Sequence, residues 1–436
     1  MKEFSASYRG VEFSGIDRIR EVQEKLLVEH LGHLINNSPY YRRTLKGIDI
    51  QNINLNNLHE LPYTDKSDFG KYCDDFLAAP LSKIVDIVFS SGTTGKPSQI
   101  MYTENDLERL AYNEEISFTG CGITADDIVL LTCTIDKCFV AGLAYFLGIR
   151  SLGAAAVRNG LNTTASHLEI IQRARPTVIV GVPSFILKLG KYIESKNIDP
   201  RGIGVKKLVC IGEPLRDKDM SLLRMGSHIE EIWGAKVFST YASSETITTF
   251  CECMMQAGGH LHPDLAIVEI VDEKGKVLQA GETGEVVVTP LSIEGMPLLR
   301  FKTGDVSFLI NEPCGCGRFS PRLGPKLGRK KQMIKFRGTT LYPQAMNAVL
   351  DGMPGISEYY ITLTSNYDLS DHVKICVSVN NGLCSSDSIA SELHAHLRVS
   401  PEVVILSDEQ MRAQLYLGNS RKILRLIDRR QTNEEL

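Results

Sequence analysis

A loop rich in glycine, serine, threonine and lysine is the stretch whose residue types most directly suggest chemistry. It reads Ser90-Ser-Gly-Thr-Thr-Gly-Lys96-Pro97 and lies between an apolar run at 84–89, which reads as a buried strand, and a second run at 100–102. Glycines let backbone N–H groups crowd round an anion, hydroxyls add donors, and Lys96 adds positive charge. This composition predicts a phosphate-binding loop, with a polar hairpin loop as the alternative. The Walker A spacing G-x-x-x-x-G-K-[ST] is absent.

Two further polar segments, Gly212-Glu213-Pro214 and the Tyr-Ala-Ser-Ser-Glu run at 241–245, each follow a strand-like run. Strand-like and helix-like runs alternate here, and this pattern predicts a parallel sheet with helices on its faces. Ligands of such folds bind beyond the carboxyl ends of the strands, so both segments can reach one crevice. The expected strands are 128–134, 154–157, 177–182, 207–211 and 236–240, and the expected helices are 139–152, 165–174, 184–195 and 217–225.

The rest of the chain predicts two further kinds of structure. Residues 16–36 have the apolar spacing of an amphipathic helix, and Thr103 with Asp106 forms a capping-box pattern that opens a helix at 104–113. Alternating apolar residues with glycine turns predict antiparallel strands at 265–310. The fold class is therefore α/β: a large N-terminal domain at 1–328, with a β-rich part at about 250–325, and a small α+β domain at 329–436. That small domain is expected to contain helices at 343–351 and 385–397 and strands at 356–363 and 372–379.

Composition excludes several classes of protein. A net charge of −4 gives no reason to propose a nucleic acid or an anionic membrane as partner. No apolar run reaches the length of a membrane span, and the first residues lack the apolar core of a signal peptide. Most of the 11 cysteines lie inside apolar runs, as Cys133, Cys210 and Cys376 do, which is typical of reduced, buried thiols. We therefore expect a cytoplasmic protein.

The remaining cysteines form two close pairs, in CECMMQAGGHLHPD at 251–264 and PCGCGR at 313–318. Together the two stretches supply four thiols and two imidazoles, and tetrahedral zinc accepts both kinds of ligand. Because C-x-C spacing is a weak signal, reduced cysteines near a loop remain the alternative.

Six segments in a fixed order resemble the adenylate-forming enzymes, a superfamily of acyl-CoA synthetases, peptide-synthetase adenylation domains and luciferases. They are residues 90–97, 211–214, 241–245, 300–305 (Arg-Phe-Lys-Thr-Gly-Asp), 327–338 and 419–425. At the N-terminus, Asn37-Ser-Pro-Tyr-Tyr-Arg42 and Leu61-Pro-Tyr-Thr-Asp-Lys66 are similar to segments of the phenylacetate–CoA ligase branch. The resemblance covers nearly the whole chain.

The resemblance implies a set of nucleotide contacts in the large domain. Tyr241 would stack on adenine, with Gly212, Glu213 and Pro214 near it, and Asp305 would accept hydrogen bonds from the ribose. Glu245 would hold Mg²⁺ and act in catalysis, because a hard cation prefers carboxylate and phosphate oxygens together. Ala242 takes the place of the usual glycine, which matters little if this backbone avoids positive φ. The implied phosphate contacts are Ser90, Ser91, Gly92, Thr93, Thr94, Gly95, Lys96, Ser243 and Ser244.

The resemblance also implies that the small C-terminal domain is mobile. Arg329 would bind nucleotide, Lys331 would stand at the hinge, and Arg337 would lie near the ribose. The backbone at Gly338 would line the channel for the pantetheine arm of coenzyme A. Lys422 would bridge the substrate carboxylate and the α-phosphate during adenylation, where a compact positive charge is most useful.

Members of the phenylacetate branch carry a C…H…C-x-C set, and the matching residues here are Cys253, His260, Cys314 and Cys316. The resemblance thus implies a structural zinc ion held by these four side chains. His260 aligns with the family histidine better than His262 does.

The expected function is ATP-dependent activation of a small carboxylic acid to an acyl-adenylate, followed by transfer to coenzyme A. A carrier protein or an amine is the alternative acceptor, and a nucleotide-binding protein without turnover is the alternative class. The acyl group is expected near 135–142 and 181–185, where Asp136, Lys137 and Cys138 replace the family's Tyr- and Gly-rich segment, so a purely aromatic acid is not expected. The sequence leaves the acid undefined and a homodimer open.

Overall fold

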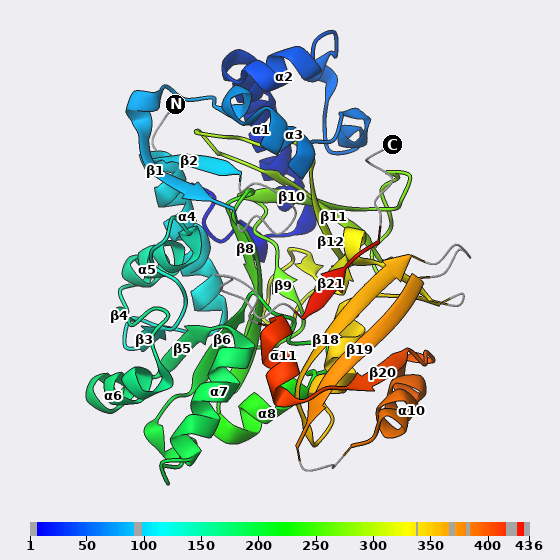
Figure 1. Ribbon diagram of the computed structural model, residues 1–436. Coiled ribbons are helices and arrows are strands. Elements are labelled where there is room, and N and C mark those ends of the chain that lie inside the picture. Colours follow the sequence, from blue (N-terminus) through cyan, green and yellow to red (C-terminus); the bar gives the residue numbers. More distant parts are fainter. Residues whose placement is uncertain are drawn as a thin grey trace. The chain divides into compact units, whose positions relative to one another are not determined.

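The computed structural model describes residues 7–90, 98–336, 339–365, 371–380, 384–415 and 425–430 (Figure 1). It contains two compact units, one within residues 1–222 and 226–326 and one within residues 223–225 and 327–436. The predicted domains, 1–328 and 329–436, remain a prediction about which parts act as functional units. Among the described residues, no helix is both long and apolar enough to cross a membrane.

The first unit begins with a helical layer built on α1 (Ile16–Asn37), α2 (Pro39–Thr44) and α3 (Lys66–Lys71). The apolar side of α1 is buried, as its periodicity predicted. This layer packs on a distant part of the chain: the Nε2 of His30 lies 2.9 Å from the carbonyl oxygen of Leu298, and Thr64 forms a parallel bridge with Phe301. Short 3-10 helices at Val11–Phe13, Ile50–Asn52, Leu58–Glu60, Cys73–Phe76 and Leu81–Lys83 join these elements.

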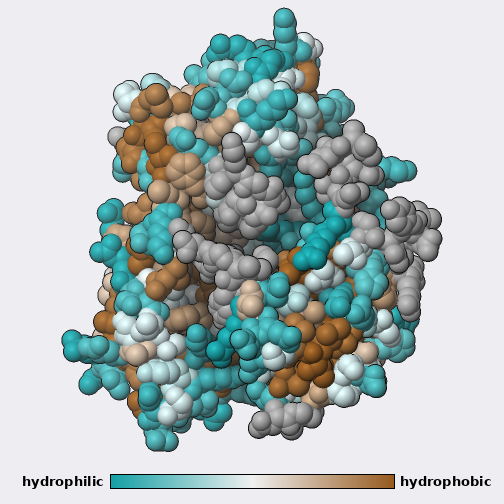
Figure 2. All heavy atoms as spheres, viewed as in Figure 1, coloured by the Kyte–Doolittle hydropathy of each residue, from teal (hydrophilic) through white to brown (hydrophobic). Residues whose placement is uncertain are grey.

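The predicted phosphate loop lies between the two strands of an antiparallel hairpin, β1 (Ile84–Phe89) and β2 (Gln99–Thr103). The interpretation of β1 as a buried strand was wrong, because Val85, Ile87 and Phe89 are 52%, 44% and 41% exposed. These side chains share one face of a strand that pairs with β2 alone in this two-stranded sheet, so only the opposite face meets the core. Figure 2 shows apolar side chains gathered over this hairpin.

A six-stranded sheet with the order β4-β3-β5-β6-β7-β8 forms the centre of the first unit. The first five strands are parallel, as the alternating pattern predicted, and β8 is antiparallel to β7. Consecutive residues of β3 are fully buried, so both faces of the sheet are covered. The strands are β3 (Ile128–Leu131), β4 (Ala155–Arg158), β5 (Val178–Gly181), β6 (Lys207–Ile211), β7 (Lys236–Ser243) and β8 (Thr248–Cys251).

Helices α4 (Glu104–Gly120), α5 (Val140–Leu152), α6 (Thr164–Ala174), α7 (Pro183–Glu194) and α8 (Arg224–Trp233) accompany this sheet (Figure 1). The predicted capping box of Thr103 and Asp106 is present and opens α4, which runs seven residues beyond its predicted end at 113. Helices α4 and α5 approach closely because Gly148 has no side chain: a Cβ there would lie 2.3 Å from the Cβ of Glu114.

The helix predicted at 217–225 was wrong. Residues 216 and 222 instead form an isolated antiparallel bridge, and the helix begins only at Arg224. Side chains compete with helical hydrogen bonds here, since the carboxylate of Asp219 accepts hydrogen bonds from both the N–H and the hydroxyl of Ser221. Met220 has a φ of 70°, outside the helical region.

The predicted antiparallel strands at 265–310 are confirmed as β10 (Ala266–Val271), β11 (Gly284–Pro290) and β12 (Phe301–Ser307). A smaller sheet joins β13 (Leu309–Ile310), β14 (Arg322–Leu323) and β9 (Gly259–His260). Arg109 of α4 ties this β-rich part to the helices. Its fully buried guanidinium donates to the carbonyl oxygens of Leu291, Ile247 and Leu265 at 2.5–2.7 Å.

The second unit is a small α+β structure with a four-stranded sheet in the order β20-β19-β18-β21. Alternate residues of β18 and β19 face opposite layers: Ile361 and Ile375 pack with residues of α9 and α10, while Tyr360 and Cys376 pack with Met411 of α11. Its strands are β15 (Gly328–Arg329), β16 (Ile334–Phe336), β17 (Thr339–Leu341), β18 (Ile356–Ser365), β19 (Asp371–Val379), β20 (Glu402–Ile405) and β21 (Leu426–Asp428). Its helices are α9 (Pro343–Asp351), α10 (Ser386–Leu397), α11 (Asp408–Leu415) and a 3-10 turn at Lys330–Gln332.

Candidate functional site

The carboxyl ends of β6 and β7 bring two predicted nucleotide segments to one edge of the sheet. The two strands are parallel neighbours with Ile211 opposite Thr240, so Gly212 and Tyr241 leave the paired region together. Gly212 has a φ of 75°, a turn conformation that favours glycine. Glu213 is already engaged, since its carboxylate accepts hydrogen bonds from the N–H and the hydroxyl of Ser184, both at 2.9 Å. Pro214 follows it and is partly buried.

Tyr241 and Asp305 lie in contact at this edge. The tyrosine hydroxyl donates to Oδ2 of Asp305 at 3.1 Å, and its ring is parallel to that of Phe250, with 6.2 Å between the centroids. Burial of the phenol, reinforced by the nearby Asp305 carboxylate, raises the pKa of Tyr241 well above its ordinary value. The tyrosine is therefore a neutral hydrogen-bond donor.

Lys326 provides a cation beside Asp305 that the sequence reasoning did not assign to the site. Its Nζ lies 2.5 Å from Oδ1 of Asp305, so the two carboxylate oxygens face different partners. Both side chains are partly buried, at 26% and 15% exposure, which strengthens the ion pair compared with one in open solvent.

Glu245 is held by two neighbours. Its Oε2 accepts a hydrogen bond from the hydroxyl of Ser243 at 3.0 Å, and its Oε1 lies 3.4 Å from Nζ of Lys66. Lys66 is the first residue of α3 and the last residue of the Leu-Pro-Tyr-Thr-Asp-Lys segment. That segment is the sequence feature that could have indicated a role for Lys66 in the site. A single carboxylate suits Mg²⁺, because this ion is commonly bound through one or two carboxylates together with substrate phosphates.

Ala242 and Ser244 complete this stretch. Ala242 lies in β7 opposite Thr249 and has no positive φ, so the replacement of the family glycine causes no backbone strain. The carbonyl of Ser244 accepts a hydrogen bond from Tyr102 of β2 at 3.1 Å, which joins this stretch to the hairpin of the phosphate loop.

Only the ends of the phosphate loop are described. Ser90 pairs with Ser98 through two hydrogen bonds, from the N–H of Ser90 to the carbonyl of Ser98 and from the N–H of Ser98 to the hydroxyl of Ser90. This pairing closes the base of the loop. Ser91, Gly92, Thr93, Thr94, Gly95 and Lys96 lie outside the described residues.

Of the residues predicted in the small domain, only two can be placed. Arg329 lies in β15 and Lys331 lies in the 3-10 turn that follows it. Arg337, Gly338 and Lys422 lie outside the described residues.

Cys253, His260, Cys314 and Cys316 are brought together from two separate stretches of the sequence, 251–264 and 313–318. One donor atom from each lies within 4.8 Å of all the others. The two thiols of Cys253 and Cys314 are 3.6 Å apart, and the thiol of Cys316 is 3.4 Å from Nε2 of His260. Tetrahedral zinc with ordinary bond lengths separates two sulfur ligands by about 3.7 Å, so the donor set and its spacing fit zinc.

Further hydrogen bonds orient three of these four side chains. The N–H of Met255 donates to the sulfur of Cys253 at 3.4 Å, and Arg318 donates to the sulfur of Cys316 at 3.5 Å. The other ring nitrogen of His260 lies 3.5 Å from the hydroxyl of Ser320. Such outer contacts are usual around metal ligands, because they fix the ligand orientation.

A buried ionic cluster lies beside this group and was not predicted. Arg318 donates to the carboxylate of Glu12 at 2.7 Å, and the same carboxylate lies 3.5 Å from Nδ1 of His262. His262 therefore contacts Glu12 and is not part of the four-donor group. Hydrogen bonds from His262 and Arg318 outweigh burial and lower the pKa of Glu12 to about 2. No pattern in the sequence could predict this contact, since Glu12 and Arg318 are 306 residues apart.

Comparison with known proteins places the chain in a family. The AMP-binding enzyme family matches residues 42–292, and the AMP-binding enzyme C-terminal domain matches residues 338–430. The chain therefore belongs to the AMP-binding enzymes, the adenylate-forming superfamily that its motifs resemble.

Individual relatives agree with this assignment. The chain is similar to phenylacetate-coenzyme A ligase of Thermus thermophilus, with 31% identity over 84% of this chain and 82% of that protein. It is also similar to phenylacetate-coenzyme A ligase of Pseudomonas putida, with 27% identity over 95% of this chain and 91% of that protein. The predicted phenylacetate–CoA ligase-like branch is thereby confirmed.

The fold is also that of a known structure. The crystal structure of 2-hydroxyisobutyryl-CoA ligase in the postadenylation state, in complex with R3-HIB-AMP, superposes with a TM-score of 0.83. The superposition covers 95% of this chain and 90% of that chain at 21% identity. The predicted α/β fold class is confirmed.

Proposed function

We propose that this chain uses ATP to ligate a carboxylic acid to coenzyme A, in two steps. In the first, a carboxylate oxygen attacks the α-phosphorus of ATP, the bond to pyrophosphate breaks, and an acyl-adenylate forms. In the second, the thiolate of coenzyme A attacks the acyl carbonyl carbon and AMP leaves. Activation in a separate first step is useful because AMP is a far better leaving group than the hydroxide that a free acid would have to release. The enzyme class is that of the AMP-forming acid–thiol ligases.

The observation that carries this proposal is the contact between Tyr241 and Asp305 beside Gly212. One aromatic ring on β7 and one acceptor carboxylate on β12 match the needs of a purine and a ribose. In this reading Tyr241 stacks on adenine while Asp305 accepts hydrogen bonds from the ribose hydroxyls. The ion pair between Lys326 and Asp305 must rearrange or share the carboxylate when the ribose arrives.

Glu245 would hold Mg²⁺, which would neutralise phosphate charge and polarise the α-phosphate. Lys66, whose Nζ lies 3.4 Å from this carboxylate, balances part of its charge. Ser243 fixes the carboxylate orientation through its hydrogen bond, and Ser244 is positioned for a phosphate contact by Tyr102. The glycines and hydroxyls of 90–96 would bind the β- and γ-phosphates.

The small domain would supply Lys422 and Arg337 for adenylation, Arg329 for nucleotide binding, and the backbone of Gly338 for the pantetheine channel. These assignments rest on sequence motifs. Lys422 would stabilise the negative charge that develops on the α-phosphate.

The acid substrate would bind beside residues 135–142. Here Lys137 and Cys138 have φ values of 65° and 54°, and the carbonyl of Cys138 accepts a hydrogen bond from the N–H of Phe89 at 2.9 Å. This contact holds the segment against the last residue of β1, immediately before the phosphate loop. Because Asp136 and Lys137 are polar, the proposed substrate is a carboxylic acid with a polar group and not a purely aromatic acid.

The four-donor cluster would hold one structural zinc ion, with all four coordination positions filled by the protein. Cys253, His260, Cys314 and Cys316 leave no open position for substrate, so the ion would stabilise the fold and take no part in chemistry.

Exchange of labelled pyrophosphate into ATP, measured across a panel of carboxylic acids, tests the first step. Acid-dependent exchange is expected, and its absence with every acid would contradict the proposal. Addition of coenzyme A should then yield a thioester. Products formed only with a phosphopantetheinylated carrier protein or with an amine would instead identify the alternative acceptors. The mass of the purified protein in solution would decide whether it forms a homodimer.

A further inference from the structure

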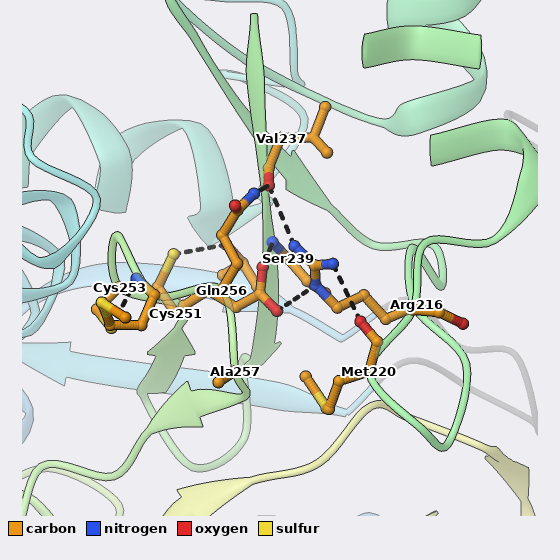
Figure 3. A network of polar contacts seen from close by, with 12 residues as sticks. Arg216, Met220, Val237, Ser239, Cys251, Cys253, Gln256 and Ala257 are labelled. Atoms are coloured by element: carbon orange, nitrogen blue, oxygen red, sulfur yellow. Dashed lines mark hydrogen bonds and ion pairs between the residues drawn. The ribbon is translucent and has the colours of Figure 1, made fainter. Parts of the chain in front are cut away.

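The four-donor cluster and the proposed adenine loop are joined by one buried ion pair, Arg216 with Glu252 (Figure 3). The two side chains are only 6% and 2% exposed, and Nε of Arg216 lies 2.5 Å from Oε1 of Glu252. A buried pair of this kind is costly to separate, because either charge alone would be left without compensation.

Glu252 is flanked by two residues of the cluster. Cys253 follows Glu252 directly in the sequence. The backbone of Glu252 forms an antiparallel bridge with Gly259, the residue before His260. The position of Glu252 is therefore tied to the positions of two of the four donors.

The carboxylate of Glu252 is fully engaged. Its Oε1 accepts from Arg216, and its Oε2 accepts from the N–H of Ser239 in β7 at 2.9 Å. The N–H of Glu252 in turn donates to the carbonyl of Ser239 at 3.0 Å. Ser239 lies two residues before Tyr241, so the same carboxylate also anchors the strand that carries the proposed adenine-stacking ring.

Arg216 organises the loop that follows β6. It lies two residues after Pro214, and it donates to the carbonyls of Met220 at 3.1 Å and of Val237 at 3.5 Å. Figure 3 shows the guanidinium between Met220 on one side and Val237 with Ser239 on the other. Gln256, three residues beyond Cys253, donates to the same carbonyl of Val237 at 2.7 Å. The loop at 212–222 and the cluster loop thus share one acceptor, the carbonyl of Val237.

We infer that Arg216 and Glu252 are positioning residues that couple occupancy of the Cys/His cluster to ATP binding. The inference rests on the proposed function, because it takes residues 212–214 and Tyr241 as parts of the ATP site. A metal ion that fixes Cys253 and His260 fixes Glu252 between them, and Glu252 then holds both Arg216 and β7. Coupling between two sites is reciprocal, so bound ATP must strengthen metal binding by the same factor by which metal strengthens ATP binding.

The test measures this coupling factor in the full-length protein. ATP affinity is measured by calorimetry with the zinc-loaded and the chelator-treated protein. Zinc affinity is measured by competition with a chelator, with and without saturating ATP. In the wild type, we expect both affinities to change by the same factor, roughly fivefold or more.

A double variant and a control variant decide whether the ion pair carries the coupling. Arg216→Met leaves a buried carboxylate unpaired, so the double variant Arg216→Met/Glu252→Gln provides a neutral pair that avoids this penalty. The double variant should bind zinc and ATP with a coupling factor near one. Lys207→Met is the matched control: it removes the partly buried ion pair with Asp127 at the opposite end of β6 and should keep the full coupling.

The outcomes are distinct. Wild-type protein that binds ATP with the same affinity before and after zinc removal would overturn the inference, as would full coupling in the double variant. Wild-type protein that binds no ATP would contradict the proposed function itself. A steady-state comparison adds a readout that a merely structural role would not move: the double variant should raise the KM for ATP at least as much as chelation does, with a much smaller effect on kcat.

Discussion

The hydroxyl of Tyr241 donates to the carboxylate of Asp305 across 3.1 Å, and this contact joins the end of β7 in the parallel sheet to β12 in the antiparallel one. Two residues that sequence motifs assign to different parts of a nucleotide therefore orient one another. Such preorganisation lowers the cost of ordering side chains on binding.

Replacement of Asp305 by alanine should weaken ATP binding. The variant loses a charged hydrogen-bond acceptor for the ribose, an interaction worth roughly 1.5–3 kcal/mol, so Kd should rise about ten- to a hundredfold. Calorimetry measures the change. Tyr241→Phe is the control, since it keeps the ring and removes only the hydroxyl, and it should cost much less. Equal ATP affinity in wild type and Asp305→Ala would refute the ribose assignment.

The purified protein should contain one zinc ion per chain. Elemental analysis of protein prepared without added metal measures the content, and removal with a chelator should lower the melting temperature, because zinc binding stabilises the folded state. Cys314→Ser should lose the metal, whereas Cys384→Ser, in the second unit, should keep it. A metal-free protein with an unchanged melting temperature would count against this site.

The two half-reactions should respond differently to changes in the small domain. Lys422→Ala removes a charge that stabilises the adenylation transition state, a loss typically of about a hundred- to a thousandfold in rate. Pyrophosphate exchange should fall below detection, while coenzyme A-dependent consumption of supplied acyl-adenylate is retained. Gly338→Leu should do the reverse, because a side chain would obstruct the thiol. Equal loss of both half-reactions in both variants would rule out rotation about Lys331.

Glu114 should make stability depend on pH. It is fully buried on α4, where Thr249 donates to it at 2.5 Å, and burial raises its pKa from 4.5 to about 7. Since the folded pKa lies above the unfolded one, the unfolded chain releases its proton first as pH rises. The contribution of Glu114 to the free energy of unfolding is therefore fully present below about pH 4.5. It is lost progressively up to about pH 7, and the loss amounts to about 3 kcal/mol.

Glu114→Gln removes this titration. Relative to wild type, the variant should gain stability between pH 4.5 and 7 and keep a constant advantage above that range, as measured by denaturant unfolding at each pH. Glu108→Gln, on the exposed side of the same helix, is the control and should follow wild type. A stability difference that does not vary with pH would show that Glu114 keeps an ordinary pKa.

Local patterns in the sequence predicted the elements that position the site. Alternating strands and helices predicted that Gly212 and Tyr241 would meet at one edge, and the spacing of Thr103 and Asp106 predicted the cap of α4. The four-donor cluster came from the family resemblance, and the structure brings its members together. These features follow from residue types that recur at short, fixed spacings.

Interactions between distant residues could not be predicted in this way. The pairs Lys66–Glu245 and Arg216–Glu252 have no spacing rule, because they form only once the fold has brought their elements together. The helix expected at 217–225 failed because Asp219 and Ser221 stabilise a turn that competes with helical hydrogen bonds. β1 was expected to be buried because its residues are apolar, but strand burial depends on what covers each face, which composition does not reveal.

The packing of the N-terminal helical layer, residues 16–66, on residues 298–301 has a consequence during synthesis on the ribosome. Thr64 can pair with Phe301, and His30 can contact Leu298, only after the ribosome has made these later residues. At typical translation speeds of about 5–20 residues per second, the intervening stretch of about 240 residues takes roughly 10–50 seconds to make. Throughout that interval the apolar side of α1 has only the partners that nearby elements such as α2 supply, and its packing is completed only when residues 298–301 have been made.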